Sequence, residues 1–131
     1  MSEMGVKTKM KKTIFFDLYG TLIDIKTDEY DLWVYSTLSQ YLSYHSVKIA
    51  PDELKDAYFE GIQRHFEQST EAHPEVDVYE IFHEIMHRYS NKRYSKAIVI
   101  DTALQFRSLT RRHFGLFPEL FDTLARLSEK Y

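Results

Sequence analysis

An aspartate at position 17 is the side chain of this sequence best placed to do chemistry. It lies in TIFFDLYGTLID, Thr13 to Asp24, after an apolar run and shortly before Gly20 and Thr21. An aspartate carboxylate has an ordinary pKa of about 3.9, so it is ionised at neutral pH and can act as a nucleophile without a base to activate it. The sequence therefore makes Asp17 the first candidate for a catalytic residue.

A second stretch, HEIMH from His83 to His87, fits the pattern His-Glu-x-x-His. On a helix the two histidines would lie one turn apart and could ligate zinc, with Glu84 as a general base. A catalytic zinc needs a third protein ligand, and the sequence has no glutamate between His87 and Glu119. We therefore favour an exposed helix in which Glu84 pairs with Arg88, and keep a zinc hydrolase as an alternative.

The element that must position Asp17 is a short strand. Thr13 to Phe16 is an apolar, β-favouring run, which predicts a strand buried on both faces, as in a parallel sheet. A carboxylate at the carboxyl end of such a strand, followed by a glycine-containing loop at Tyr19 to Thr21, lies where open α/β sheets bind ligands. The simpler alternative is a strand that ends in a polar turn.

The remaining chain has helical patterning. Pro51 is expected at a first helical position, and Asp77 with Glu80 resembles a capping box. Ala97 to Ile100 could be a strand, but the spacing of apolar residues favours one long helix that Gly115 ends. The expected helical segments are 28–45, a helix from Pro51, a helix from Val78 to Tyr89, 95–113, and a last helix opened by Pro118 and Glu119.

This pattern predicts one strand and about five helices, so the chain as given is predominantly α-helical. A lone strand leaves buried backbone groups unpaired, at a cost of roughly 1–3 kcal/mol for each group. Either Ala97–Ile100 pairs with Thr13–Phe16, or the missing strands lie beyond Tyr131.

Composition excludes several classes of function. The 131 residues carry a formal net charge of −3, which argues against a general nucleic-acid binder. The sequence has no cysteine, which excludes disulfides and thiolate catalysis, and no run suits a membrane span or secretory signal. We expect a cytoplasmic protein without a membrane or nucleic-acid partner. The basic residues near the N-terminus are expected to be a solvated lead-in: Lys7, Lys9, Lys11 and Lys12.

The stretch FDLYGTL resembles the first motif of the haloacid dehalogenase (HAD) superfamily of hydrolases, whose usual form is Asp-x-Asp-Gly-Thr-Leu. HFGLFPELFDTLARLSEKY, His113 to Tyr131, resembles the segment in which such chains return from the cap to the core. The resemblance implies an α/β, Rossmann-like core of which this chain holds a fragment. Residues 1–26 would be the first core strand and catalytic loop, 27–112 a helical C1-type cap, and 113–131 the return loop and core helix.

The resemblance also implies roles for four residues. Asp17 would form a covalent aspartyl ester that water later hydrolyses, Gly20 would let the loop turn, and Thr21 would fix it. In phosphate-transferring members, Mg²⁺ is held by the nucleophile and by the backbone carbonyl two residues on, here that of Tyr19. The substrate would be a small phosphorylated or halogenated molecule.

Tyr19 departs from the phosphatase pattern, which has a second aspartate there as general acid. Tyrosine at this place is typical of 2-haloacid dehalogenases, which work without a metal because a halide leaves without protonation. The sequence leaves both chemistries open: Mg²⁺ is expected for a phosphatase-like enzyme and no cofactor for a dehalogenase-like one.

Later motifs of the family are missing from these residues: a serine or threonine for the transferred group, a lysine, and an acidic pair for the metal. We therefore expect little or no hydrolase activity from this chain alone. The alternative from another class is a helical interaction module that keeps a degenerate motif and binds a partner. The oligomeric state is left open.

Overall fold

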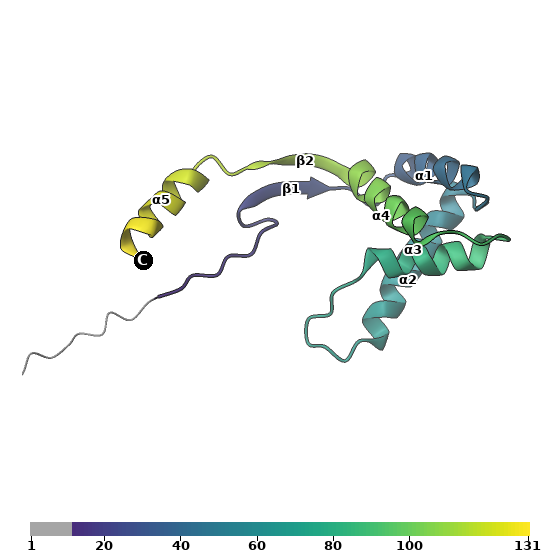
Figure 1. The fold of residues 1–131 in the computed structure, drawn as a ribbon, viewed down its shortest axis with the longest axis horizontal. Coiled ribbons are helices and arrows are strands. Elements are labelled where there is room, and N and C mark those ends of the chain that lie inside the picture. Colours follow the sequence, from purple (N-terminus) through teal and green to yellow (C-terminus); the bar gives the residue numbers. More distant parts are fainter. Residues whose placement is uncertain (1–11) are drawn as a thin grey trace, which may run out of the picture. The chain divides into compact units, whose positions relative to one another are not determined.

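The structure, a computed structural model, describes residues 12–131 (Figure 1). This part of the chain is predominantly α-helical, as the sequence predicts, and contains one two-stranded antiparallel sheet. None of its helices combines the length and the apolar character needed to cross a bilayer. In chain order the elements are β1 (Ile23–Thr27), α1 (Leu32–Tyr44), α2 (Pro51–Gln68), α3 (Val78–Tyr89), α4 (Lys96–Thr110), β2 (Arg111–Leu116) and α5 (Leu120–Lys130).

Local capping sets where most of the helices begin. Asp31 caps α1 by accepting a hydrogen bond from the Trp33 N–H, and Asp77 caps α3 by accepting one from the Tyr79 N–H. Ser95 caps α4 in the same way. Pro51 opens α2, because its missing N–H costs nothing in the first turn. The predicted helix start at Pro51 and the predicted cap at Asp77 are therefore confirmed.

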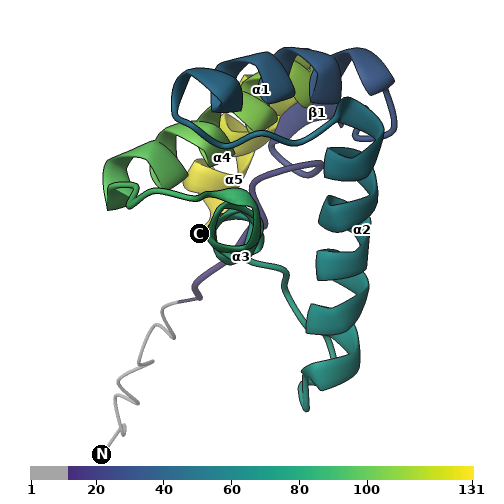
Figure 2. The same ribbon diagram turned by 90° about the vertical axis from the view of Figure 1, so that its right-hand side faces the viewer.

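Residues 27–112 form one compact unit, and every buried hydrophobic residue of the described chain lies in it, from Val34 to Phe106. Helix α1 packs on α2 and α4, and α3 packs on the same two helices, so the four close around one core. Figure 2 looks onto this unit. The centre of the core is aromatic and consists of Tyr35, Tyr58, Phe82 and Phe106.

The second unit consists of the described residues 12–26 together with 113–131. Most of β1 belongs to this unit and pairs with β2, which lies beside it in Figure 1. His113 Nε2 lies 3.0 Å from Asp24 Oδ2 across the two strands. Helix α5 is amphipathic, with Leu120, Leu124 and Leu127 along one side, yet none of its eleven described residues is buried.

The predicted buried strand at Thr13–Phe16 is wrong for this chain. These residues are extended but belong to no strand, and all four are exposed, with Phe15 at 92%. A strand buried on both faces needs neighbours that pair with both of its edges. The described residues 12–131 place no strand beside it, and Ala97–Ile100, the proposed partner, lies inside α4.

Two helix boundaries also differ from the prediction. The helix expected over 95–113 ends at Thr110, and Gly115 lies within β2 instead of ending the helix. The reason is tertiary, since residues 111–116 pair with β1, which lies far away in the sequence. The helix expected over 28–45 begins only at Leu32, because Asp31 is its cap.

The two units divide the chain after residue 26 and after residue 112. These are the boundaries expected from the sequence, whereas the assignment of one unit to a catalytic core and the other to a cap stays a prediction. Of the basic residues near the N-terminus, Lys7, Lys9 and Lys11 lie outside the described residues, and Lys12 is exposed.

Candidate active site

The loop that carries Asp17 is a tight turn closed by backbone hydrogen bonds. The Leu18 carbonyl accepts from the N–H groups of Leu22 and Ile23, at 2.9 Å each, and the Gly20 N–H donates to the Ile23 carbonyl at 2.8 Å. The Thr21 hydroxyl donates to Asp17 Oδ2 at 3.3 Å. The turn therefore brings Asp17 and Thr21 together, four residues apart, immediately before β1 begins.

Gly20 allows this turn through its backbone. Its φ is +78°, a conformation that L side chains rarely adopt. A Cβ built at Gly20 would meet nothing within 4 Å, so close approach of a neighbour is not the reason for glycine here. The residue serves the reversal of the chain between Asp17 and β1.

Asp17 itself is exposed, and Tyr19 is 60% exposed. Nucleophilic displacement on an anionic substrate needs positive groups arranged around the reacting atoms in a site that excludes water. An exposed carboxylate that accepts one hydroxyl lacks that environment. The catalytic roles expected of Asp17, Tyr19, Gly20 and Thr21 stay predictions.

Magnesium fits this loop only in part. Mg²⁺ takes six oxygen ligands and commonly uses one or two carboxylates. The Asp17 carboxylate and the Tyr19 carbonyl would supply two oxygens, but residues 12–131 contain no group of three or more acidic or histidine side chains placed to hold a metal. The described residues therefore do not form a magnesium site by themselves.

The HEIMH stretch lies on α3, with His83 and His87 exposed. Glu84 does not take the expected partner Arg88. It forms ion pairs with two residues of α2: its Oε2 lies 2.5 Å from an Arg64 nitrogen and its Oε1 lies 3.2 Å from His65 Nε2. Burial alone would raise the pKa of Glu84, but the hydrogen bond from His65 and the charge of Arg64 together lower it. Glu84 therefore joins two helices, and the part of the chain that the structure describes places no zinc-binding group of three side chains around it.

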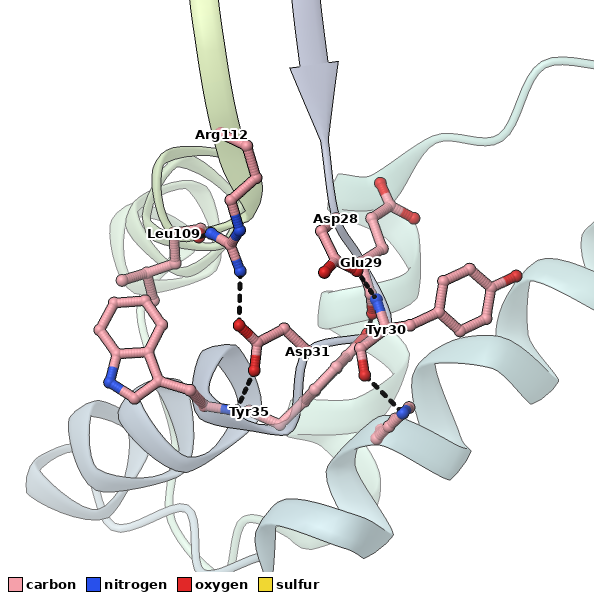
Figure 3. Close-up of polar contacts among 9 residues, drawn as sticks. Asp28, Glu29, Tyr30, Asp31, Tyr35, Leu109 and Arg112 are labelled. Carbon is pink, nitrogen blue, oxygen red and sulfur yellow. Dashed lines mark hydrogen bonds and ion pairs between the residues drawn. The ribbon is translucent and has the colours of Figure 1, made fainter.

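Polar contacts missed by sequence reasoning gather where the helical unit begins and ends (Figure 3). The Asp28 N–H donates to the Thr110 carbonyl at 2.8 Å. Arg112 donates to Asp31 Oδ2 and to the Leu109 carbonyl, at 2.7 Å each. Asp31 thus both caps α1 and holds the start of β2. We call these contacts the neck of the helical unit.

Glu29 connects the neck to the aromatic core. Its backbone carbonyl accepts from the Tyr35 hydroxyl at 2.7 Å, and its carboxylate accepts from the Tyr58 hydroxyl at 3.1 Å. Burial, followed by the charge of Glu29, raises the pKa of both tyrosines above the ordinary value. The two hydroxyls remain neutral donors, so they hold the entering chain against the core and do no acid–base chemistry near neutral pH.

The neck had one local signal in the sequence. Asp31 precedes an apolar helix and could have been identified as a cap from its residue type. Its partner Arg112 is 81 residues away, and no local pattern connects the two.

Comparisons with protein-family models, with curated proteins and with solved structures find no match to this chain.

Proposed function

We propose that this chain carries the nucleophile loop and the helical cap of a HAD-like hydrolase that acts on a small phosphorylated or halogenated substrate. Asp17 is the nucleophile. Its carboxylate oxygen attacks phosphorus or the halogen-bearing carbon, the leaving group departs with the electrons of the broken bond, and an aspartyl ester remains. Water then hydrolyses this ester and regenerates the carboxylate.

The observation that carries this proposal is the loop from Asp17 to Ile23. Its sequence resembles the first motif of the superfamily, and it folds as a closed turn with Gly20 at positive φ and the Thr21 hydroxyl on the carboxylate. A mere strand end needs none of these features in combination. The arrangement suits a carboxylate whose direction is fixed by its own loop.

The chain path supports the cap assignment. Strands β1 and β2 are antiparallel neighbours, and the whole helical unit is inserted between them. The chain leaves at Asp28 and returns at Thr110, where a backbone hydrogen bond joins the two ends. An insertion of this kind can vary without breaking the unit that contains Asp17, which is the property expected of a cap.

A test in two steps separates the parts of the proposal. The purified 131-residue chain should turn over neither p-nitrophenyl phosphate nor 2-chloropropionate at a significant rate, because Asp17 is exposed and lacks cationic neighbours in fixed positions. The product of the complete reading frame, whatever its length, should turn over one of the two substrates and lose this activity on Asp17→Asn. Asp122→Asn on α5 is the matched control and should retain it. Full activity in Asp17→Asn would refute the assignment.

The second candidate is a non-catalytic interaction module. It is favoured by the apolar side chains that the unit of 12–26 and 113–131 leaves exposed, among them Phe15 at 92% and Phe121 at 69%. Exposed apolar surface of this kind is typical of a contact with another protein surface. Absence of turnover by the complete product on both substrates, at a sensitivity that detects a slow enzyme, would favour this candidate.

A further inference from the structure

Two adjoining hollows lie at the C-terminal half of α3, both within the helical unit. One has a volume of about 600 Å³ and is lined by Arg64, Arg88, Glu84 and the two histidines of HEIMH. The other has a volume of about 520 Å³ and is lined by Lys92, Arg93, Tyr94 and the same two histidines. Since His83 and His87 line both hollows, the two form one continuous surface. Hollows of this size accommodate small molecules.

The charge on this surface is strongly unbalanced. Glu84 is its one acidic lining residue, and that carboxylate already pairs with Arg64 and His65. Arg88, Lys92 and Arg93 take part in none of the ion pairs found within residues 12–131. Three cations thus face solvent around two imidazoles, in a chain whose formal net charge is −3. A local excess of positive charge on an acidic chain attracts anions to that place.

Part of the surface is held in a fixed conformation. The Tyr94 hydroxyl donates to the His83 carbonyl at 3.2 Å, and the Tyr94 ring packs edge-on against the His83 ring with centroids 6.0 Å apart. The Ser90 hydroxyl donates to the Lys92 carbonyl at 2.8 Å, which shapes the turn that carries Lys92 and Arg93. The basic side chains therefore project from an ordered turn.

We propose that this surface is a binding site for a small soluble anion with at least two negative charges on phosphate groups, with Arg88, Lys92 and Arg93 as its principal ligands. Guanidinium groups match phosphate oxygens with paired hydrogen bonds, and lysine adds a point charge. The net negative charge of the chain disfavours an extended polyanion such as a nucleic acid. The same cations disfavour a divalent metal on the histidine pair. This site does not depend on the hydrolase proposal.

Isothermal titration calorimetry of the full chain with pyrophosphate, in metal-free buffer at low ionic strength, tests the site. We expect saturable binding that weakens with added salt. Arg88→Ala and Arg93→Ala should each weaken it roughly threefold to fivefold, the effect of losing one exposed charge contact. The double variant should weaken it about tenfold or more. Arg126→Ala on α5, which lines neither hollow, removes the same charge and should leave binding unchanged. Circular dichroism checks that each variant is folded.

Further arms exclude other sources of the signal. Asp17→Asn should bind pyrophosphate as the unchanged chain does, which separates this site from the catalytic loop. Absence of binding at millimolar pyrophosphate, or equal affinity in the double variant, would overturn the proposal. So would binding to vesicles of anionic phospholipid without binding to pyrophosphate. Zinc binding that is lost in His83→Ala, without any pyrophosphate binding, would show a metal site in its place.

Discussion

Replacing Phe106 with alanine removes the ring around which the helical unit is packed. Phe106 is fully buried on α4, and its ring centroid lies 4.5 Å from that of Tyr58, 5.2 Å from that of Phe82 and 6.0 Å from that of Tyr35. These three neighbours come from α2, α3 and α1. The substitution thus opens a cavity at the one point where all four helices meet.

The expected loss of stability is large. Substitutions of a buried phenylalanine by alanine cost about 3–5 kcal/mol, and each aromatic pair adds about 0.5–1.5 kcal/mol beyond the buried area. Because alanine has no ring to pack against these three neighbours, we expect a loss of about 4 kcal/mol or more. A domain of this size has a total free energy of unfolding of about 5–10 kcal/mol, so the variant should be close to its stability limit.

Urea denaturation followed by far-UV circular dichroism measures this loss. For an m value of about 1.5 kcal/mol per molar, a loss of about 4 kcal/mol lowers the midpoint by about 3 M. Leu104→Ala on the same helix is the matched control: Leu104 is 60% exposed, and its loss should cost less than about 0.5 kcal/mol. Similar midpoints for Phe106→Ala and Leu104→Ala would refute the packing described for this core.

Four further outcomes follow from the structure. The fragment 27–112 should fold alone with helical circular dichroism and a cooperative transition, because all the buried hydrophobic residues of the described chain lie within it; a non-cooperative transition would contradict this. Burial and the Glu29 carboxylate raise the pKa of Tyr58 above its ordinary value of 10.0, so stability should fall as pH rises past that value, and the fall should be shallower in Tyr58→Phe by urea titration at alkaline pH. The pKa of Glu84 is lowered in the folded state, so its ion pairs stabilise the protein above the ordinary pKa of glutamate and the benefit is lost as pH falls through the folded value. Glu84→Gln should therefore be less stable than the unchanged chain at pH 7, by less than about 1 kcal/mol because the groups are partly exposed, and equally stable in acid. Gly20→Ala should cost about 1 kcal/mol through its positive φ and Gly20→Asn less, and equal melting temperatures for the two variants would contradict that reasoning.

The features that sequence reasoning predicted correctly are those that neighbouring residues determine. Pro51 and Asp77 act on the first turn of their own helices, so residue type and spacing suffice to place them. For residues 96–110 the apolar spacing extends over four turns, which favours a helix over a short strand at Ala97–Ile100. Such signals do not depend on the rest of the fold.

The features that it missed depend on residues far apart in the chain. Thr13–Phe16 has the composition of a strand, but composition does not provide a neighbour to pair with. Conversely, β1 and β2 are strands only because they find one another across the helical unit. Glu84 has Arg88 within reach on its own helix, yet it pairs with Arg64 and His65 of α2, because the packing of α3 on α2 brings them closer.

The candidate site shows the same division. The sequence identified the loop from Asp17 to Thr21, since a glycine at positive φ and a nearby hydroxyl are local features. The neck, with Asp31 and Arg112, and the basic surface beside α3 were not predicted. Both arise from side chains that only the folded helical unit brings together.

Detection of a covalent adduct on Asp17 is the most direct test of the proposed chemistry. The product of the complete reading frame would be mixed in excess with p-nitrophenyl phosphate or 2-chloropropionate, quenched rapidly, digested and analysed by mass spectrometry. We predict that the peptide containing Asp17 gains the mass of the transferred group, and that the adduct is absent in Asp17→Asn. An active protein whose adduct lies on another residue, or that keeps its activity in Asp17→Asn, would contradict the account.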